Sequence, residues 1–110
     1  MIKNIIPRHS FVYEGARMDI YHANKGEGLS KHIHQFNHGT FCMAGSCHVR
    51  KEGKELLTNK DTSPLNMVAY EWHEIEAAED GTVFCNIFAE QFMYDELTKF
   101  YNENNDVTVI

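Results

Sequence analysis

Seven of the 110 residues are histidines, roughly three times the share expected of an ordinary soluble domain. His32 and His34 are two apart in a run that reads as a strand, so their side chains should leave one face about 7 Å apart. His38 begins the next such run, and His73 lies in a later one. Neutral imidazole nitrogens bind divalent ions such as Fe(II), Ni, Zn, Mn and Cu. These four residues are therefore candidate metal ligands, although a His-x-His pair alone is also common on a solvated strand face.

The elements that must position these rings are mostly short strands. Polar and apolar residues alternate with period two in runs separated by Gly, Asn, Asp and Pro, which is typical of antiparallel sheets. The predicted strands are Phe11–Tyr13, Arg17–His22, Leu29–Phe36, Thr40–Met43, Cys47–Lys51, Glu55–Thr58, Asn66–Glu71, His73–Glu76 and Thr82–Ala89. Met93, Leu97, Phe100 and Tyr101 then follow helical spacing and predict a packing helix over about 90–104. The sequence therefore predicts an all-β sandwich or barrel with a short C-terminal helix.

One turn can be predicted in more detail. Ala44-Gly45 has the composition of a two-residue hairpin loop, because Gly supplies the positive φ that such turns need. That hairpin would pair Cys42 directly with Cys47. It would also place Cys42, Cys47 and Val49 on the less polar face, together with His38. We expect this face to be the interior one.

The three cysteines are odd in number and follow no Cys-x-x-Cys spacing, so they are predicted to be reduced thiols. Cys42 lies about 13 Å along a strand from His38, far beyond a metal–sulfur bond, and we expect it to pack rather than ligate. Of the remaining histidines, His9 and His48 are expected at the surface. If Met18 and Ile20 face inward, period two puts His22 on the same face, towards the core or rim.

The spacing of the first three histidines resembles the first motif of the cupin family. That motif reads Gly, five residues, His, one residue, His, three or four residues, Glu, six residues, Gly. The chain has Gly26, His32, His34, His38 and Gly45 at these intervals, with His38 where the family usually has Glu.

The second cupin motif is matched only at its histidine. It reads Gly, five residues, Pro-x-Gly, two residues, His, three residues, Asn. Aligned on His73, the chain has Thr62, Val68, Tyr70 and Ala77 where the motif has Gly, Pro, Gly and Asn. The resemblance therefore covers about residues 26–88, and it is specific in the first motif only.

The resemblance implies one cupin domain over residues 1–110, an antiparallel jelly-roll β-barrel that holds one divalent ion near its mouth through His32, His34, His38 and His73. Because cupins often pair through edge strands, it also implies a homodimer. Small cupins include dioxygenases, lyases and isomerases, so the reaction stays open. Fe(II) oxygenase chemistry on a small molecule is the first expectation. The alternatives are a metal- or ligand-binding cupin without turnover, and a metal-free cupin similar to sugar isomerases.

The charge of the chain limits its partners. The formal net charge is −6, and no basic stretch is longer than Arg50-Lys51, which argues against nucleic acid and membrane surfaces as partners. A fourth neutral imidazole in place of Glu would make the metal site more positive by one charge and favour an anionic substrate or a bound hydroxide. The longest apolar run near the start is Ile5-Ile6, too short for a signal peptide, so we expect a cytoplasmic location. No carboxylate is assigned a catalytic role.

Overall fold

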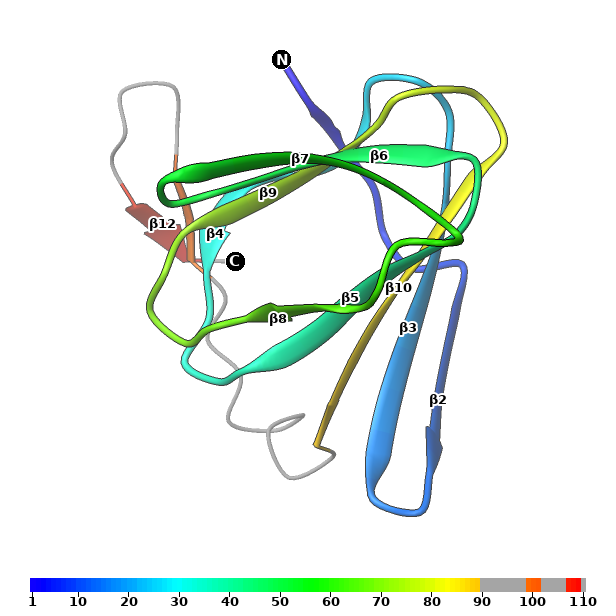
Figure 1. Cartoon of the computed structure of the whole chain (residues 1–110). Coiled ribbons are helices and arrows are strands. Elements are labelled where there is room, and N and C mark those ends of the chain that lie inside the picture. Colours follow the sequence, from blue (N-terminus) through cyan, green and yellow to red (C-terminus); the bar gives the residue numbers. More distant parts are fainter. Residues whose placement is uncertain (90–98, 102–106, 110) are drawn as a thin grey trace.

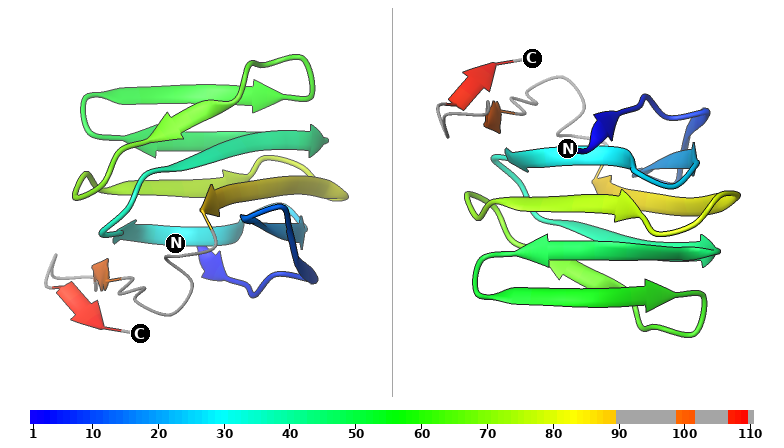
Figure 2. Two further views of the ribbon diagram at one scale, coloured as in Figure 1. Left: turned by 90° about the horizontal axis from the view of Figure 1, so that it is seen from below. Right: turned by 90° about the horizontal axis from the view of Figure 1, so that it is seen from above.

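Two β-sheets enclose the core in the computed structural model, which describes residues 1–89, 99–101 and 107–109 (Figures 1 and 2). The strands are β1 (Lys3–Asn4), β2 (His9–Tyr13), β3 (Ala16–Ala23), β4 (Glu27–Ile33), β5 (His38–Ala44), β6 (Ser46–Lys51), β7 (Lys54–Asn59), β8 (Leu65–Met67), β9 (His73–Ala77), β10 (Thr82–Ala89), β11 (Lys99–Tyr101) and β12 (Val107–Val109). One sheet has the order β12-β11-β4-β9-β6-β7, with β1 beside β4, and the other has the order β2-β3-β10-β5-β8. Pairing is antiparallel throughout these sheets except between β1 and β4.

All nine predicted strands are present, and the all-β fold class is confirmed. The prediction of a C-terminal helix is wrong at Lys99–Tyr101, which form the strand β11. Phe100 there pairs with His32 of β4, so the segment satisfies backbone groups along β4 instead of forming a helix. The rest of the predicted helix, 90–98 and 102–104, lies outside the described residues. No helix among the described residues is long and apolar enough to cross a membrane.

The predicted hairpin at Ala44-Gly45 is wrong, because β5 and β6 belong to different sheets. β5 pairs with β10 and β8, whereas β6 pairs with β7 and β9. Gly45, with φ of 70°, is the corner at which the chain crosses from one sheet to the other. The predicted inward face is nevertheless correct. Cys42 and Cys47 are both buried, and their sulfurs lie 3.9 Å apart between the sheets.

Apolar side chains fill the interior between the two sheets. Tyr21 of β3 and Phe84 of β10 stack with ring centroids 4.8 Å apart, and Val49, Met67 and Ile75 pack in the same cluster. The cysteines are free thiols in this interior, and burial raises the pKa of Cys85 to about 11. Thiols that resist ionisation in this way are poor nucleophiles and ligands, which agrees with a packing role.

The corner at Gly45 should tolerate no side chain. A Cβ at this position would meet the side chain and backbone of Thr82, in addition to the strain of a positive φ. We expect Gly45→Ala to lower the free energy of unfolding by about 3 kcal/mol, as measured by urea denaturation. Gly53 has a similar φ of 76° but open space around it, so Gly53→Ala should cost only about 1 kcal/mol. Equal losses in the two variants would contradict the steric role of the corner.

Candidate metal centre

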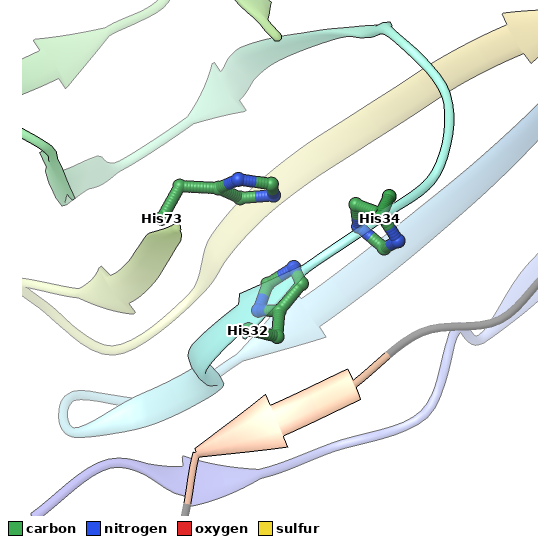
Figure 3. Close-up of side chains that lie close together, drawn as sticks. All are labelled: His32, His34 and His73. Atoms are coloured by element: carbon green, nitrogen blue, oxygen red, sulfur yellow. The ribbon is translucent and has the colours of Figure 1, made fainter. Parts of the chain in front are cut away.

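Three histidine rings converge from two neighbouring strands. His32 near the end of β4 lies opposite His73, the first residue of β9, and His34 follows just after β4 (Figure 3). One potential ligand nitrogen from each ring lies within 4.8 Å of the others. All three residues are buried, so the cluster could hold a metal ion away from bulk water.

The backbone leaves the strand after Ile33, yet the alternation continues through the connection to β5. His32, His34, Phe36 and His38 are buried, and the residues between them are more exposed. The predicted strand Leu29–Phe36 is therefore shorter than expected, but the predicted direction of its side chains is correct. The ring of Phe36 lies against that of His34, with centroids 4.9 Å apart.

His38 joins the cluster from the other sheet. Its Nε2 lies 3.2 Å from Nε2 of His73, and its ring centroid is 4.8 Å from that of His34. The structure thus brings together all four histidines singled out by the sequence. The three-residue group whose nitrogens are all mutually close consists of His32, His34 and His73, and His38 adjoins it through His73 and His34.

In His32 and His73, hydrogen bonds to backbone carbonyls determine which ring nitrogen carries the proton. Nδ1 of His32 lies 2.6 Å from the carbonyl oxygen of Ser30, and Nδ1 of His73 lies 3.2 Å from that of Glu71. Because a carbonyl can only accept, Nδ1 is the donor in both rings. Nε2 therefore presents a lone pair in both rings.

His38 is held through a side-chain relay. The hydroxyl of Thr40 donates to Oδ1 of Asn86 at 2.7 Å, so it can only accept from Nδ1 of His38, which lies 3.1 Å away. Nε2 of His38 then carries a lone pair as well. Such partners on the far nitrogen are usual for histidines that bind metals.

The facing Nε2 atoms of His38 and His73 fit a cation better than they fit each other. Two lone pairs 3.2 Å apart cannot share a hydrogen bond. Two imidazoles bound to one ion at about 2.0–2.1 Å, with ordinary angles at the metal, have nitrogens about 3.0–3.4 Å apart. The observed separation agrees with that requirement.

Burial keeps these rings neutral. It lowers the pKa of His32 and His38 to about 4 and that of His34 to about 2, and the pKa of His73 is lowered further still. For His34 and His73 the neighbouring rings add to the effect, because each would repel a second positive charge. Neutral imidazole is the form that binds a metal, so the cluster is ready for one at neutral pH.

The Thr40 relay makes a prediction. Thr40→Val keeps the shape of the side chain but leaves Nδ1 of His38 only its longer contact with the carbonyl of Gly39, at 3.4 Å. We therefore expect Zn(II) affinity to fall about tenfold in a chelator competition. Thr58→Val is the matched control, because the Thr58 hydroxyl is also buried but bonds to the carbonyl of Cys47 away from the cluster. Equal affinities of the two variants would rule out the relay as a support of the site.

The loop before His73 is held to the first histidine segment. The amide of Tyr70 donates to the carbonyl of His34 at 2.8 Å, and the amide of Ala69 donates to Oδ1 of Asn37 at 2.7 Å. These bonds end the predicted strand Asn66–Glu71 early, at Met67. Tyr70 has a φ of 66°, at the position where the second cupin motif has Gly.

Tyr70 should therefore show a reversed preference between Gly and Ala. Its side chain is 70% exposed, so both substitutions remove little packing. Because the positive φ favours Gly, we expect Tyr70→Gly to be about 1 kcal/mol more stable than Tyr70→Ala, opposite to the usual order. Thermal and urea unfolding of the pair measure this difference. An Ala variant as stable as the Gly variant would show that the loop relaxes to another conformation.

The other histidines lie outside the cluster. His9 is exposed, as predicted, and His48 is partly buried rather than fully at the surface. The expected inward direction of His22 is wrong, because Asp19 and Tyr21 occupy the inner face of β3 and His22 is exposed. Sequence reasoning also missed Asn86, a polar residue at an inward strand position.

Comparisons with known proteins identify the fold. No protein-family model and no curated protein matches the sequence. A cupin-2 domain protein of Shewanella frigidimarina is 9% identical, with a TM-score of 0.61 over 76% of this chain and 82% of that one. A putative acetylacetone dioxygenase of Methylibium petroleiphilum is 16% identical, with a TM-score of 0.67 over 93% of this chain and 70% of that one. An acetylacetone dioxygenase of Acinetobacter johnsonii is 18% identical, with a TM-score of 0.64 over 94% of this chain and 67% of that one. The chain therefore has the fold of a small cupin.

Proposed function

We propose that the chain binds one divalent metal ion through His32, His34, His38 and His73 and uses it as an enzyme acting on a small molecule. The observation that carries this proposal is the meeting of four buried rings, of which His32, His38 and His73 have Nδ1 bonded to an acceptor. Fe(II) oxygenase chemistry is the first candidate. The two acetylacetone dioxygenases of similar fold support that class.

The ion would supply Lewis-acid or one-electron chemistry. The chain itself orients the rings through Ser30, Glu71 and the Thr40 hydroxyl, so little rearrangement is needed on loading. The buried ring of Phe36 lies against that of His34, with centroids 4.9 Å apart, and gives the cluster an apolar neighbour. Four neutral ligands leave the ion's charge uncompensated, which favours an anionic substrate.

Two measurements on the untagged protein test this function. Elemental analysis after anaerobic purification should find about one metal per chain, with iron as the expected element. Less than about a tenth of a metal per chain, even after incubation with Fe(II), would rule out the proposal and favour the metal-free sugar-isomerase-like alternative.

The second measurement separates an enzyme from a closed binding module. Nitric oxide added to the Fe(II) protein, or azide added to the Co(II) protein, should change the absorption spectrum, because a catalytic site keeps an exchangeable position. A metal-loaded protein whose spectrum stays unchanged with both ligands would have a closed site and would favour a binding or sensing role.

We also propose a homodimer that forms through β2. This strand ends the second sheet among the described residues, and all five of its residues are exposed, including Phe11, Val12 and Tyr13. An exposed apolar edge strand is suited to pairing with a second copy. Light scattering should give twice the monomer mass, and Val12→Lys should give the monomer. A monomeric unmodified chain at high concentration would overturn this pairing.

A further inference from the structure

A row of three inward side chains runs from the histidine cluster across the second sheet. On β10, Phe88 pairs with Arg17 of β3. The pairing of β10 with β5 reaches Ile87 and Gly39, so the next residue on each strand puts Phe88 beside His38. Two strand spacings separate His38 from Arg17, about 10 Å between their Cα atoms. A guanidinium therefore shares the inner face of this sheet with the metal-ligand candidates.

Ring contacts link Arg17 to the cluster without a break. The guanidinium carbon lies 5.9 Å from the centroid of the Phe88 ring. Phe88 packs on Phe36 at 5.0 Å, and Phe36 packs on His34 at 4.9 Å. Both phenylalanines are buried. The side chains that connect the guanidinium to the histidine rings are thus aromatic and carry no charge that would compete for an anion.

The orientation of Arg17 is fixed at one nitrogen only. Its Nε bonds to Oδ1 of Asp19 at 3.0 Å, and the hydroxyl of Ser10 donates to the same oxygen at 2.7 Å. Asp19 is buried, whereas the Arg17 side chain is 25% exposed. Neither Nη group of Arg17 bonds to any residue that the structure describes. The planar end of the fork is therefore available to a ligand, and a carboxylate matches its geometry.

We propose that Arg17 binds the carboxylate of a small anionic ligand whose other end faces the histidine cluster. The ligand class is a short dicarboxylate or a comparable small acid with an oxygen donor at each end, because about 10 Å between the backbone positions leaves room for only a few bonds. This inference deepens the proposed function, since the metal would hold the second end. Asp19 acts as a positioning residue that turns the fork inward.

A matched pair of probes tests the role of Arg17. Succinate carries a carboxylate at each end, and butanoate has the same chain length with only one. We would titrate each into the Zn(II)-loaded and metal-free protein and follow the ¹⁵N signals of the Arg17 guanidinium, with Zn content measured in parallel. Succinate should bind the loaded protein about tenfold to a hundredfold more tightly than butanoate, with shifts at Arg17.

Three variants complete the test. Arg17→Gln should weaken succinate binding about tenfold to a hundredfold. Arg17→Lys keeps the charge but loses the two-pronged guanidinium, so its succinate affinity should lie between those of the unmodified chain and Arg17→Gln. Arg8→Gln makes the same charge change at an exposed position and should leave the affinity unchanged. Thermal unfolding and Zn content should show that all variants are folded and loaded as the unmodified chain is.

The outcomes separate this inference from the metal proposal. Equal succinate affinities of the unmodified chain, Arg17→Gln and Arg17→Lys would overturn the role of Arg17. So would the absence of succinate binding to all three proteins. If the unmodified chain takes up no metal but still binds succinate in an Arg17-dependent manner, the metal proposal fails and the carboxylate site stands. If Arg17→Gln fails to fold, the comparison of the unmodified chain with Arg17→Lys decides the role of Arg17, because the lysine charge can still pair with Asp19.

Discussion

Replacing His73 by Ala should remove nearly all bound metal, leaving less than about a tenth of an equivalent per chain. The ring of His73 lies against every other ring of the cluster, and its Nε2 lies 3.2 Å from Nε2 of His38. Loss of a partner outside the metal's own ligands typically costs up to about a hundredfold in affinity, so loss of a ligand should cost more. Elemental analysis and Zn(II) competition measure this loss.

The same assay decides whether the ligand set has three or four members. His38→Ala should also reduce Zn(II) affinity by more than about a hundredfold if His38 binds the ion. The matched control is His48→Ala, which removes a partly buried histidine from β6 outside the cluster and should retain full metal. Full loading of His38→Ala together with loss in His73→Ala would reduce the ligands to His32, His34 and His73.

Acid should unfold the metal-free protein within a narrow range of pH. Burial lowers the pKa of His32 and His38 to about 4, whereas unfolded histidine has a pKa of 6.5. Between these values the unfolded chain binds more protons, so the free energy of unfolding falls as pH falls from about 6.5 towards 4. Each such ring contributes about 1.4 kcal/mol per pH unit, so the four together lower the free energy of unfolding by about 5 kcal/mol per pH unit. A domain stabilised by about 5–15 kcal/mol cannot withstand that loss far below pH 5.

Urea unfolding at pH 7, 6 and 5 measures this slope. His22→Ala is the control, because His22 is exposed and outside the cluster, and it should leave the slope unchanged. In the loaded protein, metal release and unfolding should coincide, since protons compete for the folded rings only near pH 4. An equal free energy of unfolding at pH 7 and pH 5 would show that the rings are already charged or exposed.

The cluster could be predicted because its information is local. His32, His34 and His38 keep their inward direction through period two, and the first cupin motif fixes their spacing. The corner at Gly45 could not be predicted, because a positive φ suits both a hairpin and a crossing between sheets. Which of the two forms depends on the pairing of β5 with β10, which is distant in the sequence. For β3, alternation left open which face is inward, and the structure places Asp19, paired with Arg17, on the inner face. The identity of the metal, the homodimer, the cytoplasmic location and the single domain over 1–110 stay predictions.

The pairing of β10 has a consequence for the order in which the protein assembles during synthesis. β10 lies between β3 and β5, so Ala23 of β3 cannot pair until its partner Thr82 has been synthesised. The second sheet therefore cannot form completely before β10 has been made. At about 5–20 residues per second, that delay lasts several seconds. The pairings of β4, β6, β7 and β9 need the chain only as far as Ala77. His32 and His73 can therefore meet, and an ion can reach them from the open side, before the wall that carries Arg17 and Phe88 is in place.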